Sequence, residues 1–166
     1  MEDQSRPVLP KTSSSGEKAM NVISVLLLLS SLAYIIYMWN DLPESVPIHF
    51  NGLGEPDRWG GKGGVLTLPI VGFFVFSLTY GLSKFPHGFN YPIPVTKENA
   101  EKLYRISKTM LATLNLVMSF FFSIGTWEMV QVAFGKPGFG VWYLPLLFVG
   151  LFGTIGYYLF RMFRLK

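Results

Sequence analysis

Residues 20–39 read MNVISVLLLLSSLAYIIYMW, a stretch without a single charged side chain. A helix of about 20 apolar residues is long enough to cross the hydrocarbon core of a bilayer, which is about 30 Å thick. Across the whole chain, 50% of the residues are hydrophobic and only 14% are charged, whereas soluble domains carry roughly 25% charged residues. The stretch and the composition together predict a membrane protein.

Three further segments are comparably apolar, and none of them contains Lys, Arg or Asp. Glu128 is the one acidic residue within them. The sequence therefore predicts an all-α membrane protein, a four-transmembrane-helix bundle that occupies residues 19–166. Residues 1–18 are polar, and we expect them to form a disordered tail. The expected spans are residues 20–39, 65–82, 109–130 and 141–160.

A cleaved signal peptide is the alternative interpretation of the first span. Ser31, Leu32 and Ala33 offer the small residues found at signal-peptidase sites. The apolar run nevertheless continues beyond Ala33 as far as Tyr37, and this length favours a retained helix.

The positive charges predict the direction of the spans. Of the 14 Lys and Arg residues, 11 lie in the two tails and in the loop between the second and third spans, and 3 lie in the other two loops. The positive-inside rule then places the N- and C-termini in the cytoplasm. Tryptophan rings prefer the membrane interface, and all four fall on the outer side in this arrangement: Trp39, Trp59, Trp127 and Trp142.

The polar segment at residues 40–64 separates the first two spans, and from residue 46 it reads VPIHFNGLGEPDRWGGKGG. Apolar side chains occupy every second position at its start, which is typical of a short strand. Asn51-Gly52 is a turn signal. We expect a hairpin that forms a small extracytoplasmic cap, in which His49 and Asp57 lie close together.

The polar side chains of this cap are candidates for binding a ligand. One histidine and two carboxylates are conceivable ligands for a transition metal, but a second nearby histidine and an HExxH motif are both missing. We therefore expect no metal and no cofactor. The structural alternative is that these side chains only hold the turn together by hydrogen bonds. The candidate residues are His49, Asn51, Glu55, Asp57 and Lys62.

Two polar residues lie within the third span. Asn115 near its middle is either a hydrogen-bonding contact between helices or a contact for a substrate. Glu128 near its outer end is either a functional group, because ionisable groups are costly in a membrane, or a side chain simply exposed at the interface.

The stretch LPESVPIHFNGLGEPDRWGGK at residues 42–62 resembles the signature of the membrane proteins grouped as domain of unknown function 1648. FNYPIPVTKENAEKLY at 89–104 is also similar to an inner loop of some members. The resemblance covers the first two spans well and the second half loosely. The signature positions are filled by Pro43, Pro47, His49, Asn51, Gly54, Asp57 and Lys62.

The resemblance implies a bacterial protein of the cytoplasmic membrane, because SdpI-like immunity proteins are relatives of this family. These relatives protect a bacterium from a secreted peptide toxin, and they tend to have more spans than four. We expect a non-enzymatic protein of immunity or envelope-stress type that meets a secreted peptide or a lipid-borne ligand through its outer loop. The expected surroundings are the lipid bilayer and, as a further candidate, a second copy of the chain.

Other functions rank lower on the sequence. A small transporter or lipid-handling protein is the alternative, supported by Asn115, Glu128 and a weak internal repeat. A membrane hydrolase that uses His49 and Asp57 ranks third, because the outer loops offer no convincing nucleophile and the chain has no cysteine. Nucleic-acid binding is not expected, because Lys and Arg lie at the edges of apolar runs.

The weak repeat joins the starts of the second and fourth spans. GVLTLPIV at residues 64–71 and GVWYLPLL at 140–147 share Gly, Val, Leu and Pro at equivalent positions. The pattern indicates either two repeated helix pairs or the ordinary use of Gly and Pro at helix starts.

Two local features complete the expectations. Thr96 and Asn99 predict an N-cap for a helical turn that leads into the third span. Small residues allow close approach of helices in lipid, so we expect four glycines to face neighbouring helices. They are Gly72, Gly150, Gly153 and Gly156.

The charge distribution generates a prediction about orientation. Single cysteines placed at Ser45 and at Lys136 should react with a membrane-impermeant thiol reagent on intact cells, because both positions belong to outer loops. A cysteine at Asn99 should stay unlabelled until the membrane is broken. Labelling of Asn99→Cys without labelling of Ser45→Cys would overturn the orientation.

Overall fold

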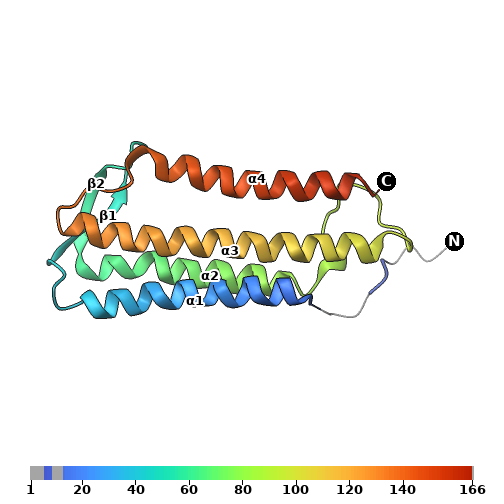
Figure 1. The fold of residues 1–166 in the computed structure, drawn as a ribbon, viewed down its shortest axis with the longest axis horizontal. Coiled ribbons are helices and arrows are strands. Elements are labelled where there is room, and N and C mark those ends of the chain that lie inside the picture. The colour runs from blue at the N-terminus through green and yellow to red at the C-terminus, as the bar shows by residue number, and fades with distance from the viewer. Residues whose placement is uncertain (1–5, 9–12, 166) are drawn as a thin grey trace.

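The computed structural model describes residues 6–8 and 13–165. Four long helices run alongside one another (Figure 1), and with the short turns that lead into two of them they are long and apolar enough to cross a membrane. A two-stranded sheet follows the first helix. The expected four-helix membrane bundle is therefore confirmed. Its helices are α1 (Ser15–Met38), α2 (Thr67–Leu82), α3 (Ala100–Ala133) and α4 (Tyr143–Phe163).

The two ends of the bundle differ. One end carries strands β1 (Ser45–Phe50) and β2 (Pro56–Gly61), and we call it the hairpin end. The other holds the start of α1 and the end of α4, and we call it the terminal end (Figure 1). The 3-10 turns η1 (Lys62–Leu66) and η3 (Gly140–Trp142) lead into α2 and α4 at the hairpin end, and η2 (Pro86–Gly88) follows α2 at the terminal end.

Helix α3 lies at the centre of the bundle. It packs against α1, α2 and α4, whereas α4 packs mainly on α3 and lies apart from the other two (Figure 1). With 34 residues, α3 is about 51 Å long and exceeds the hydrocarbon core. A turn closed by Thr96 and Asn99 leads into its first residue, Ala100: the Asn99 N–H donates to Thr96 Oγ1 at 3.3 Å, and the Thr96 N–H donates to Asn99 Oδ1 at 2.9 Å. The expected cap is confirmed.

The burial pattern of the bundle is the reverse of that in a soluble protein. Large apolar side chains point outward, and the exposed fractions of Phe74 and Val149 are 69% and 71%. Lipid accepts such surfaces, while small residues let helix backbones approach one another. The buried positions between helices accordingly include Ser24, Ser31, Ala112, Asn115, Ser119 and Thr126.

Asn115 is buried where α1, α2 and α3 meet. Its Nδ2 donates to Asn21 Oδ1 at 3.1 Å, and its Oδ1 accepts from the Thr79 hydroxyl. The Ser123 hydroxyl adds a second bond from α3 to α1, to the Leu27 carbonyl at 2.8 Å. Of the two interpretations of Asn115, these contacts support the hydrogen-bonding contact between helices.

Helix α1 begins at Ser15, earlier than the expected residue 20. The side chains of Ser14 and Glu17 form a capping box there, which fixes the first turn. The expectation of a disordered segment at 1–18 is therefore wrong for residues 15–18, and residues 1–5 and 9–12 lie outside the described part. The short motif Ser14-x-x-Glu17 is the signal in the sequence for this helix start.

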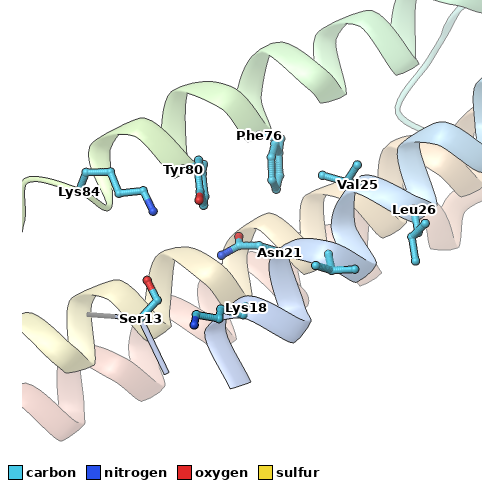
Figure 2. Close-up of a pocket in the computed structure, with 9 residues that line it drawn as sticks. Ser13, Lys18, Asn21, Val25, Leu26, Phe76, Tyr80 and Lys84 are labelled. Carbon is cyan, nitrogen blue, oxygen red and sulfur yellow. The ribbon is translucent and has the colours of Figure 1, made fainter. Parts of the chain in front are cut away.

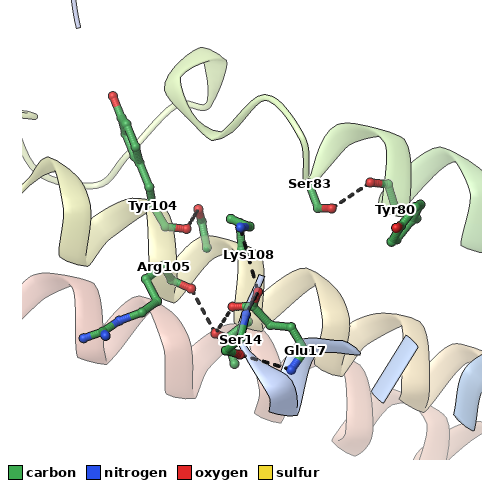
Figure 3. A network of polar contacts seen from close by, with 9 residues as sticks. Ser14, Glu17, Tyr80, Ser83, Tyr104, Arg105 and Lys108 are labelled. Atoms are coloured by element: carbon green, nitrogen blue, oxygen red, sulfur yellow. Dashed lines mark hydrogen bonds and ion pairs between the residues drawn. The ribbon is translucent and has the colours of Figure 1, made fainter. Parts of the chain in front are cut away.

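Glu17 also joins α1 to α3 at the terminal end (Figure 3). Its Oε1 accepts from the Thr109 hydroxyl at 2.8 Å, and its Oε2 lies 3.9 Å from the ammonium nitrogen of Lys108. The Glu17 carboxylate is buried, so these partners satisfy a charge that would otherwise be costly.

The glycine expectations divide evenly. Gly72 packs against Leu28 and Phe122, and Gly150 packs against Val117 and Phe121, so both face neighbouring helices as expected. The expectation is wrong for Gly153 and Gly156, where an added Cβ would meet nothing within 4 Å. Both lie on the part of α4 that is turned away from α3, because α4 has only one close neighbour.

These glycines give a matched pair of variants. Gly72→Ala should lower the melting temperature, because the new Cβ would lie 2.6 Å from Leu28 Cδ2 and overpacking costs about 1–3 kcal/mol. Gly153→Ala should leave it unchanged or raise it slightly, because alanine favours the helix. Circular dichroism of both purified variants in detergent measures this, and an equal fall in both would contradict the described packing.

Candidate functional site

The segment between α1 and α2 folds as an antiparallel hairpin. β1 pairs with β2 from Ser45, which lies opposite Gly61, to Phe50, which lies opposite Pro56. The pairing is irregular between Pro47 and Phe50, which is how bulged strands redirect side chains. The expected cap is confirmed as a hairpin.

Asn51 organises the turn of the hairpin. Its Oδ1 accepts from the backbone N–H groups of Leu53 and Glu55 at 2.8 and 3.0 Å. Its Nδ2 donates to Glu55 Oε2 at 3.2 Å. A short amide side chain is suited to closing a turn on its own backbone in this way, so both Asn51 and Glu55 contribute to the shape of the loop.

The tip of the hairpin contacts the start of η3. Gly54 has a φ of +76°, and a Cβ at this position would overlap the backbone of Gly140. Gly140 itself has a φ of +59°. Glycine is therefore required here both for the backbone conformation and for the close approach, and the contact links the hairpin to the second half of the chain.

His49 and Asp57 form the expected pair across the two strands. Their Nδ1 and Oδ1 atoms are 2.6 Å apart, and the side chains are 56% and 43% exposed. When the imidazole is neutral, donation from Nδ1 to the carboxylate leaves Nε2 as a hydrogen-bond acceptor. Asp57 therefore orients His49. An exposed pair of this kind contributes about 0–1 kcal/mol to stability.

A cavity of about 240 Å³ lies beneath the hairpin. The hairpin covers one side of it, and the adjoining parts of α2, α3 and α4 form the others. Its walls are mostly apolar side chains, with a histidine, a carboxylate and a phenol among them. The lining residues are Ile48, His49, Phe50, Asn51, Gly54, Thr67, Leu68, Gly125, Glu128, Met129, Tyr143 and Leu144.

Glu128 is the carboxylate of this cavity. It is only 5% exposed, so the interpretation of simple exposure at the interface is wrong. Its Oε1 accepts from the backbone N–H of Phe139 in the loop between α3 and α4. A buried carboxylate with one bond to a backbone donor retains acceptor capacity at its other oxygen.

Tyr143 is a cavity residue that the sequence analysis missed. Its hydroxyl donates to the Phe121 carbonyl at 2.7 Å, which joins α4 to α3. A signal for it was present, because the weak repeat aligns Tyr143 with Thr67 and Leu144 with Leu68. All four of these residues line the cavity. The repeat thus marks two helix starts that contribute equivalent positions to one site.

Lys62 lies away from the cavity. Its ammonium group lies 5.3 Å from the centroid of the Trp39 ring and 3.8 Å from Glu44 Oε1. These contacts fasten the base of the hairpin to the end of α1. Asn115 is likewise not among the residues that line the cavity.

The metal alternative gains no geometric support. Across residues 6–8 and 13–165, no group of three His, Asp or Glu side chains is placed to hold an ion. The site is instead an apolar cavity with a few polar groups in its walls, which is the common form of a small-ligand site.

Comparison with known proteins finds similarity over part of the chain. A segment of 52 residues is 42% identical to a protein of Archaeoglobus fulgidus described as an uncharacterized protein. This segment is 31% of the present chain and 27% of that relative, so the chain matches only about a quarter of the relative's length. No solved structure matches.

A family model matches residues 26–73, which run from the middle of α1 through the hairpin into α2. The matched family is described as a domain of unknown function, DUF1648. The matched segment includes the signature positions of the hairpin, among them His49, Asn51 and Asp57. The resemblance expected from the sequence is therefore confirmed over residues 26–73, which are similar to DUF1648.

Proposed function

We propose that this chain is a non-enzymatic recognition protein of immunity or envelope-stress type, embedded in a bacterial cytoplasmic membrane with both termini inside. Its ligand-binding site is the cavity under the hairpin, on the outer side. The observation that carries the proposal is that the hairpin is not a simple tether. It covers a cavity whose other walls come from α2, α3 and α4.

The chemistry of the cavity favours a peptide ligand. Ile48, Leu68 and Met129 offer apolar walls, and Glu128 offers a buried carboxylate. A secreted peptide with an apolar side chain and an amino group matches both features, because a carboxylate in apolar surroundings binds a cationic donor strongly. The volume of about 240 Å³ suits one side chain or a peptide end.

Catalysis ranks below binding on the same geometry. A hydrolase that used His49 and Asp57 as acid and base would need an activated nucleophile within reach of the ring. The hydroxyls that line the cavity are those of Thr67 and Tyr143, and the Tyr143 hydroxyl already donates to the Phe121 carbonyl.

Transport also ranks below binding. Asn115 was the mid-membrane residue that favoured it, and both ends of its amide are engaged with Asn21 and Thr79.

A protection assay tests the proposal. A strain without this gene is challenged with a panel of secreted peptide toxins, and the growth-inhibitory concentration is compared after complementation. Glu128→Gln should cost about 1.5–3 kcal/mol of binding, which is roughly ten- to hundredfold in affinity, and should lower protection accordingly. Asp57→Asn should lower protection less, because this change only weakens the contact that orients the His49 ring.

Arg58→Gln is the matched control, because Arg58 is an exposed neighbour of Asp57 on β2 and does not line the cavity. It should protect as well as the unchanged chain. The amount of each variant in the membrane is measured in parallel. Full protection by Glu128→Gln at normal abundance would refute recognition through this cavity. The proposal would also be refuted if the unchanged chain protected against none of the peptides in the panel.

A further inference from the structure

A second hollow lies toward the terminal end of the bundle, between α1 and α2 (Figure 2). Both helices pack on α3 more closely than on each other, so a groove stays open between them. Its volume is about 760 Å³, within the range of roughly 300–1,000 Å³ that holds small ligands. Nothing in the hairpin-end cavity depends on it, and it is independent of the function proposed above.

The groove changes in character along its length. At its deep end Val25, Leu26 and Phe76 make an apolar surface, and at its outer end Lys18 and Lys84 face the opening (Figure 2). Lys84 lies eight positions after Phe76, two residues beyond the end of α2. Leu26 lies eight positions after Lys18 in α1, which is about 12 Å along the helix. That length is close to the depth of one leaflet, about half of the 30 Å hydrocarbon core.

The two lysines have no acidic partner in the described part of the chain, residues 6–8 and 13–165. The Lys84 ammonium lies 3.9 Å from the centroid of the Tyr80 ring, which places it at the edge of the groove. Lys108 at the same end of the bundle differs, because its ammonium lies beside the Glu17 carboxylate.

Successive residues of α1 face different neighbours. Glu17 points toward α3, where Thr109 and Lys108 surround its carboxylate, whereas Lys18 lines the groove (Figures 2 and 3). The negative charge of Glu17 is thus neutralised inside the bundle, and the positive charge of Lys18 stays on the side of the groove. The groove therefore carries a net positive charge at its opening.

We propose that this groove binds an anionic phospholipid, with its phosphate between Lys18 and Lys84 and an acyl chain along Val25 and Phe76. Charge complementarity selects the headgroup, since basic pockets between membrane helices bind anionic lipid headgroups. The apolar floor selects a lipid over a soluble phosphate. The assignment holds in either orientation, because the terminal end meets headgroups on whichever side it lies.

Photo-crosslinking tests this site. The full chain is placed in phosphatidylcholine nanodiscs that contain a trace of phosphatidylglycerol with a photoactivatable acyl chain, and the labelled peptides are mapped. We expect labels on residues 18–26 and 76–84. Lys18→Gln with Lys84→Gln should reduce this labelling on the order of tenfold. Val25→Trp should also reduce it, because the indole fills the groove while both lysines remain.

The matched control is Lys97→Gln with Lys102→Gln, which removes the same charge from the same end without touching the groove. It should leave the labelling unchanged. The proposal is overturned if the control lowers labelling as much as the groove variant, or if photoactivatable phosphatidylcholine labels the groove equally. It is also overturned if soluble glycerol phosphate displaces the probe, or if the groove crosslinks to a second copy of the chain instead of lipid.

Discussion

Asn115 lies where α1, α2 and α3 meet, and the bundle depends on contacts of this kind. Lipid tails are as apolar as leucine, so burial of apolar surface gives helices little reason to associate within a membrane. The Asn115 amide provides a directional contact to Asn21 on one side and to Thr79 on the other. Small buried residues such as Ser24 and Ser119 let the backbones come close enough for these bonds.

The hairpin-end cavity follows from the central position of α3. Because α4 rests mainly on α3 and is held there by bonds such as Tyr143 to Phe121, a space remains at the hairpin end between α2, α3 and α4. The hairpin covers that space, and Glu128 is buried within it although it lies close to the end of a membrane helix. The position of one helix thus creates the environment in which a carboxylate is shielded from water.

Features set by local sequence could be predicted, and features set by the rotation of a helix could not. The hairpin and the pairing of His49 with Asp57 follow from alternation and turn residues, which act over a few positions. The exposure of Gly153 depends on where α4 sits around α3, and composition carries no information about that. The weak repeat aligned Tyr143 with Thr67, but a repeat does not say that two helix starts meet at one cavity, so the role of Tyr143 emerged only from the packing of α4 on α3.

The contact between Gly54 and Gly140 has a consequence for how such chains can be recombined. Gly54 belongs to the segment that matches the family model, and Gly140 lies well outside it. The matched segment therefore supplies one side of this contact, and the turn η3 between α3 and α4 supplies the other. A chain that combines the signature hairpin with different later helices still has the hairpin. It needs its own residue that lets the backbone approach Gly54 as closely as Gly140 does, before the hairpin can cover a cavity in the same way.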